Sequence, residues 1–265
     1  MILHYDIQDI IPYINWLYFY HAWSMNGKSE TAKLQLRKDA EEMLHTWEGG
    51  YHTHAVFGLF DANSDGDDLI LGDKRLPMLR QQKPKKPGYP NLCLADFVRP
   101  VGKGKDKVGV FATSVDAELQ KAYLHDDYQR MLSQVLADRL AEGTAEKMHE
   151  EVRRNYWGYA PNERLTMEQT HNEQYQGIRP AVGYPSLPDT SINFILNELI
   201  DMKGIGIRLT ESGMMTPHAS VSGLMLAHPG SCYFELGRIG ADQINDYARR
   251  RGLPVELIRR FLKGV

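Results

Sequence analysis

The longest helical pattern in this 265-residue chain covers residues 127–156. Apolar side chains recur there mostly at steps of three and four residues, which places them on one face of a helix. They are Tyr128, Met131, Leu132, Val135, Leu136, Leu140, Ala145, Met148 and Val152. A helix with such a face packs against a core. The pattern therefore predicts a central helix over residues 127–156.

The rest of the chain mixes helix and strand signals. Residues 29–47 have the spacing of a second amphipathic helix, which ends before Gly49 and Gly50. Residues 54–60 and 69–71 are predicted to form a hairpin joined by the polar residues 61–68. Further strands are expected at residues 108–113, 206–209, 222–227 and 233–236, and further helices at residues 191–202, 241–250 and 254–261. This order is typical of the α+β class.

Two segments are predicted to be irregular. Residues 82–91 contain three prolines and a glycine and are expected to form an exposed loop. Residues 158–188 are also dense in glycine and proline, yet aromatic and charged residues remain among them. Recognition often lies on such loops when a rigid scaffold holds them. We therefore expect residues 158–188 to form part of a binding surface.

Length and charge narrow the class of protein. A chain of this length fits one large domain or two closely fused lobes, and we expect one domain over residues 1–265. The net charge is only −3, and the one basic run, residues 83–86, is short, so we expect no nucleic-acid partner. The sequence has neither a secretion signal nor an apolar run of membrane-spanning length. These features favour a cytoplasmic protein without a membrane partner.

Three patterns favour a structural role over metal binding. Asp61, Asn63 and Asp65 resemble the start of a calcium loop, but the twelfth position is a glycine where a glutamate is required. The pair His52 and His54 would lie on one side of a strand without a third ligand at a recognisable spacing. Cys93 and Cys232 have no zinc or disulfide spacing, and both are predicted to be buried apolar residues. We therefore expect no metal site.

Two neighbouring motifs carry a resemblance. The segment Tyr156-Trp-Gly-Tyr-Ala-Pro-Asn-Glu163, followed by Gln176-Gly-Ile-Arg-Pro-Ala-Val-Gly-Tyr-Pro185, resembles the activation domain of cobalamin-dependent methionine synthase. The resemblance extends over nearly the whole chain, through residues 14–16, 23–28, 93–98, 125–128, 136–142, 209–212, 219–223, 228–229 and 246–250. It implies a helmet-like α+β domain with a bent antiparallel sheet, flanking helices and no Rossmann topology.

The resemblance also implies a function. In this family the domain binds S-adenosylmethionine and docks over a cobalamin held by another domain. A flavodoxin-like donor reduces cob(II)alamin to cob(I)alamin, which takes the methyl group and restores the active cofactor. Since the other modules of the enzyme are not in this chain, its cobalamin is expected on a partner subunit in trans. Two alternatives remain: a docking module with weak or lost S-adenosylmethionine binding, and an activator of another corrinoid protein.

Nine residues are implied to bind S-adenosylmethionine. Arg179 would hold the carboxylate, because a planar guanidinium suits that group. Tyr184 would lie nearest the transferred methyl group. The set is completed by Glu142, Glu173, Ala181, Gly183, Tyr233, Phe234 and Asn15. Asn15 replaces an aspartate of the family and loses its negative charge. The chain is expected to have no catalytic residue of its own and not to catalyse methyl transfer alone.

Overall fold

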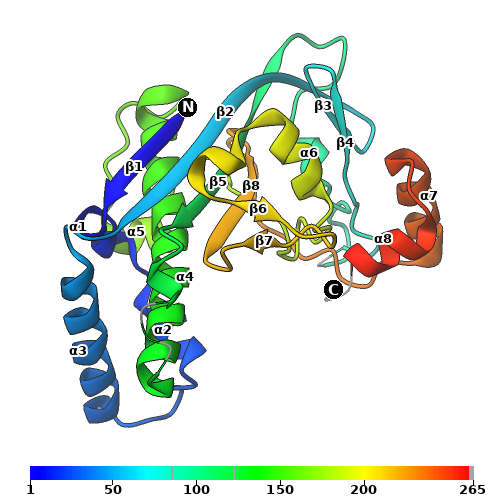
Figure 1. Ribbon diagram of the computed structural model, residues 1–265. Coiled ribbons are helices and arrows are strands. Elements are labelled where there is room, and N and C mark those ends of the chain that lie inside the picture. The colour runs from blue at the N-terminus through cyan, green and yellow to red at the C-terminus, as the bar shows by residue number, and fades with distance from the viewer. Residues whose placement is uncertain (85, 122, 124, 263–265) are drawn as a thin grey trace.

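A computed structural model describes residues 1–84, 86–121, 123 and 125–262. Its centre is a curled antiparallel sheet with helices on both faces (Figure 1). The longest strand, β2 (His52–Asp65), pairs along one edge with β5 (Asp106–Val115), and β5 pairs in turn with β8 (Ser220–Met225).

The other edge of β2 is shared by two strands. Its first residues pair with β1 (Ile2–Asp6), and its last residues pair with β3 (Asp68–Leu71), which continues to β4 (Lys74–Pro77). Every pairing between these strands is antiparallel. A Rossmann fold needs a parallel sheet. The predicted fold class, α+β with a bent antiparallel sheet and flanking helices, is therefore confirmed.

Apolar residues cover both faces of the central strands. Phe57 and Phe111 belong to one core cluster, whereas Val56 and Val110 belong to a second cluster on the other face. Successive side chains of a strand point to opposite faces, so burial of both faces requires an unbroken apolar run. This explains why residues 54–60 and 108–113 carry a strand signal without polar alternation.

The first face of the sheet is covered by α4 (Asp127–Glu151), the predicted central helix. The Asp126 side chain caps it by accepting a hydrogen bond from the Gln129 amide at 2.9 Å. The last predicted turn, Val152–Tyr156, is a π-helix instead. Beside α4 lie α1 (Ile7–Ile10), α2 (Trp16–Ala22) and α3 (Glu30–Trp47).

The second face is covered by α6 (Ile192–Leu199), and α7 (Ala241–Arg251) and α8 (Val255–Phe261) build a third, smaller cluster at the far end of the molecule from α3 (Figure 1). A short helix, α5 (Met167–His171), interrupts the irregular segment. The strands β6 (Arg208–Leu209) and β7 (Met215–Thr216) form a separate hairpin. Single 3₁₀ turns occupy Ile11–Tyr13, Leu94–Phe97, Leu119–Lys121 and Met202–Ile205.

Several local predictions are wrong. Residues 233–236 form no strand, because their polar backbone groups bond to loops. The Leu236 backbone amide donates to the Pro185 carbonyl, and the Glu235 carbonyl accepts from the side-chain amide of Gln81. Residues 61–65 do not form the hairpin turn but continue β2, because they pair with β3 and β5. The sequence also gave no signal for β1 or α2.

The prediction that both cysteines are buried is half right. Cys93 is buried as expected, but Cys232 is exposed. The described part of the chain holds no group of three His, Cys, Asp or Glu arranged for a metal ion, and none of its helices has the length and apolarity to cross a bilayer. The His54 ring bonds to the Asp116 carboxylate at 2.9 Å, in keeping with a structural role. Lys85, in the basic run, lies outside the described residues.

Candidate ligand-binding cavity

A cavity of about 1510 Å³ opens beside the middle of α4. It is lined by α4, by parts of the irregular segment between residues 171 and 186, by residues 232–240 and by the loop around residues 81–92. Such a volume exceeds the roughly 300–1000 Å³ that is typical of small-molecule sites. The predicted binding surface in residues 158–188 therefore forms one wall of a space that can hold a large ligand.

One face of α4 and of the π-helical turn that follows it carries four ionisable side chains. Glu142, Glu146, His149 and Arg153 are spaced by four, three and four residues, so they stack along the same face of the helix. Glu142 and Glu146 line the cavity, while His149 and Arg153 are fully buried behind it. The two glutamates therefore bring negative charge to the cavity, with His149 and Arg153 directly behind them.

The arginine loop lies along the outer edge of β8. The Leu224 amide donates to the Pro180 carbonyl at 3.0 Å, and the Val182 amide donates to the Ser222 carbonyl at 2.8 Å. Gly223 permits this approach, because a Cβ there would stand only 2.2 Å from the Pro180 carbonyl oxygen. The sheet therefore fixes the backbone that carries the predicted ligand-binding arginine.

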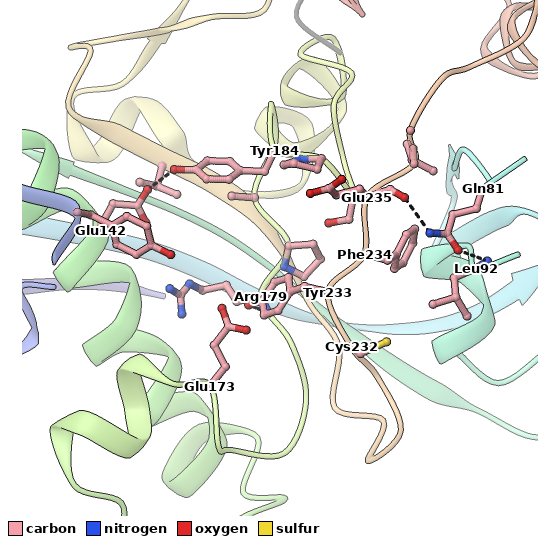
Figure 2. Close-up of a pocket in the computed structure, with 18 of the residues that line it drawn as sticks. Gln81, Leu92, Glu142, Glu173, Arg179, Tyr184, Cys232, Tyr233, Phe234 and Glu235 are labelled. Atoms are coloured by element: carbon pink, nitrogen blue, oxygen red, sulfur yellow. Dashed lines mark hydrogen bonds between the residues drawn. The ribbon is translucent and has the colours of Figure 1, made fainter. Parts of the chain in front are cut away.

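Arg179 points into the cavity and is nearly buried (Figure 2). Its guanidinium lies 3.2 Å from a carboxylate oxygen of Glu146 and 3.5 Å from Nδ1 of His149, and its backbone amide donates to the Tyr233 hydroxyl. Burial alone would lower the pKa of Arg179, but the charge of Glu146 and the Tyr175 and Tyr233 hydroxyls raise it overall. The guanidinium is therefore a permanent cation.

Glu173 supplies a second carboxylate near Arg179. Its backbone has a φ of 56°, in the left-handed region that only a few non-glycine residues adopt. Burial and the charge of Glu146 raise the pKa of Glu173 above its usual value of 4.5. One oxygen of Glu146 is also buried without a hydrogen-bond partner among the described residues. At one end of the cavity, the guanidinium is complementary to the carboxylate of an amino acid, and the two carboxylates are complementary to its ammonium group.

Tyr184 lines the cavity beside Glu142, one turn of α4 from the Glu146 that pairs with Arg179. Its side chain is 50% exposed, and its hydroxyl donates to Glu142 at 2.5 Å (Figure 2). Burial of the phenol and the charge of Glu142 raise the pKa of Tyr184. Gly183, just before it, does not line the cavity; its φ of 88° serves the turn that closes between Ala181 and Tyr184. A tyrosine ring and a carboxylate together favour a cationic group here.

The third wall is aromatic. Tyr233 and Phe234 line it together with Cys232, and the Phe234 ring packs against Phe97 with centroids 6.4 Å apart. Asn15 also lines the cavity, and its side-chain oxygen caps α2 by accepting from the Leu17 amide at 3.1 Å. Flat aromatic surfaces at this wall suit a heteroaromatic ring system.

The structure brings eight of the nine predicted residues to one cavity, with Gly183 the exception. Sequence reasoning missed several lining residues, among them Glu146 and Tyr175, which both raise the pKa of Arg179. Glu146 follows Glu142 by one helical turn, which was the available signal. His171, at the end of α5, also lines the cavity and was not among the predicted site residues.

Comparison with known proteins shows which family this chain resembles. A family model described as "Vitamin B12 dependent methionine synthase, activation domain" matches residues 6–252. A solved structure described as "Crystal Structure of the MetH Reactivation Domain bound to AdoHcy" is similar over 99% of this chain and 88% of that chain, with 40% sequence identity and a TM-score of 0.92. The chain therefore belongs to the activation-domain family of vitamin B12-dependent methionine synthase.

Proposed function

We propose that this chain binds S-adenosylmethionine in the cavity and presents its methyl group to a cobalamin on a partner subunit. The observation that carries the proposal is the placement of Arg179, Glu146 and Glu173 together, with Tyr184 and Glu142 one helical turn away along α4. The first set of side chains suits the amino-acid end of S-adenosylmethionine, and the second set suits its sulfonium centre. The similar reactivation domain is bound to AdoHcy, the methyl donor after loss of its methyl group.

Each part of the ligand has a wall that suits it. The guanidinium of Arg179 would hold the carboxylate, and Glu173 would face the ammonium group. Tyr233 and Phe234 would stack on the adenosine, with backbone groups at Ala181 completing the hydrogen bonds. Tyr184, half-exposed, would lie nearest the methyl group, so that the sulfonium meets a ring face and the charge of Glu142.

The chain's part in the reaction is to bind and orient the donor. Cobalamin, when docked, supplies the reduced cobalt centre that accepts the methyl group while the carbon–sulfur bond breaks. We propose that residues 1–265 form one domain, that the cobalamin comes in trans, and that a flavodoxin-like protein gives the electron. Asn15 favours a second reading, a docking module with weakened donor binding, because a neutral amide replaces the carboxylate expected from the family.

Calorimetric titration tests the ligand site. We expect saturable binding of S-adenosylmethionine and S-adenosylhomocysteine by the wild-type chain. Arg179→Ala should weaken both about ten- to a hundredfold, the effect of losing a hydrogen bond to a charged group. Arg249→Ala is the matched control, because its side chain is 75% exposed and, among the described residues, pairs with Asp246 on its own helix α7. Absence of binding at millimolar ligand would contradict the proposal, and co-purification with a cobalamin subunit would test the partner.

A further inference from the structure

Behind the cavity, a row of buried side chains leads from one family motif to the other. Glu163, the last residue of the first motif, holds Arg153 with oxygens 2.7–3.1 Å from its guanidinium nitrogens. Arg153 donates to Nδ1 of His149 at 2.9 Å. The same Nδ1 atom lies 3.5 Å from the guanidinium of Arg179, the central residue of the second motif. The row therefore ends at the proposed carboxylate-binding group.

His149 in this row is a neutral acceptor. It is fully buried, and burial together with the charges of Arg153 and Arg179 lowers its pKa well below 6.5. Because both guanidinium groups are donors only, Nδ1 must accept and the proton must lie on Nε2. Nε2 in turn faces the Tyr159 hydroxyl at 3.5 Å. The surroundings therefore fix both the charge and the tautomer of the ring.

Neutralising Arg153 does not require His149. Arg153 is fully buried, its charge is balanced by Glu163, and its guanidinium stacks over the Tyr175 ring at 4.0 Å. It is carried by the π-helical turn that ends α4, a distortion often found at functional sites. The contact from Arg153 to His149 therefore orients the imidazole and adds nothing to the charge balance.

The contact with His149 affects the orientation of the Arg179 side chain. A guanidinium has five N–H groups, and the described contacts of its side chain are those with Glu146 and His149. The bond to Glu146 alone would leave the guanidinium free to turn about that contact. The single Nδ1 lone pair is shared between Arg153 at 2.9 Å and Arg179 at 3.5 Å, so the contact with Arg179 is the weaker one. Together with the bond to Glu146 it restricts this rotation and leaves further N–H groups for a ligand carboxylate.

We propose that His149 is a positioning residue for Arg179: its neutral Nδ1, held by Arg153, sets the direction in which the guanidinium meets the carboxylate of the methyl donor. This inference rests on the proposed function and adds a residue that touches no ligand. It also gives the first motif a role at the site, because Glu163 acts on Arg179 through Arg153 and His149.

Two amide variants test the proposal. His149→Asn places an oxygen near the Nδ1 position, whereas His149→Gln places its amide near the Nε2 position and leaves the Nδ1 side without an acceptor. Both keep a polar side chain, and thermal unfolding checks that both fold. The titrants are S-adenosylhomocysteine and 5′-methylthioadenosine, which lacks the amino-acid end. We expect His149→Gln to weaken S-adenosylhomocysteine about tenfold and to leave 5′-methylthioadenosine unchanged, while His149→Asn stays within about threefold of wild type.

The Arg179→Ala background completes the test. If His149 acts through Arg179, His149→Gln has no further effect on S-adenosylhomocysteine once Arg179 is removed. Equal weakening of both ligands, an effect that persists without Arg179, or unchanged affinity in His149→Gln would overturn the inference while Arg179→Ala still supports the proposed function. Absence of S-adenosylhomocysteine binding by the wild-type chain would instead overturn the proposed function, and the inference with it.

Discussion

Gly223→Ala should damage the arginine loop from the sheet side. The added Cβ would stand 2.2 Å from the Pro180 carbonyl oxygen and 2.9 Å from the Ala181 Cα, both backbone atoms. Real Cβ contacts essentially never fall below 3.0 Å, so the loop must retreat by about 0.8 Å. The retreat strains two hydrogen bonds between loop and strand, at 3.0 and 2.8 Å.

The expected loss of stability follows from these contacts. Overpacking costs about 1–3 kcal/mol, and weakening two backbone hydrogen bonds adds about 1 kcal/mol. The smaller conformational entropy of unfolded alanine offsets about 0.4–1 kcal/mol of this. We therefore expect the free energy of unfolding to fall by about 1–4 kcal/mol. S-adenosylhomocysteine should bind at least tenfold more weakly because Arg179 moves with the loop.

Urea denaturation and calorimetric titration measure the two effects. Gly50→Ala is the matched control, since its Cβ would meet nothing nearer than 3.8 Å. We expect that control to stay within about 0.5 kcal/mol of wild type. A Gly223→Ala protein with wild-type stability and affinity would refute the reasoning that β8 fixes the loop.

Four further changes test other parts of the site. Asn15→Asp should tighten S-adenosylmethionine binding about tenfold or more in calorimetry, because aspartate keeps the cap of α2 and restores a negative charge. Glu163→Gln should lower the free energy of unfolding in urea by about 3 kcal/mol, since it leaves the fully buried Arg153 uncompensated. Glu173 has a raised pKa, so its protonated form stabilises the fold fully below pH 4.5, and this stability is lost as the pH rises through the folded pKa. Glu173→Gln should therefore be more stable than wild type at neutral pH and equal to it near pH 4, as measured by thermal unfolding across pH. N-ethylmaleimide should modify the exposed Cys232, and bound S-adenosylhomocysteine should slow that reaction in mass spectrometry; an unchanged rate would argue against a ligand at this wall.

The sequence by itself determined the local elements and the chemistry of the loop. The helix over residues 30–47 begins at its Ser29 cap and ends where predicted, and α4 follows its apolar spacing as far as Glu151. These features depend on periodicity and capping within a few residues, which one segment contains completely. The motif around Arg179 likewise led, through its resemblance to a known family, to the proposed ligand.

Only the tertiary structure determined which distant residues contact Arg179 and which segments pair or become buried. Arg179 meets Glu146 and His149 from α4, more than 29 residues away, and Gly223 supports its loop from a strand still further along the chain. Residues 233–236 have strand composition, yet they pair with none of the described strands, and their backbone bonds to loops instead. Cys232 is exposed because it lies on the wall of the cavity, whereas Leu236 of the same segment is buried in a core cluster. Pairing and burial depend on which distant segments pack together, and local spacing carries no information about that choice.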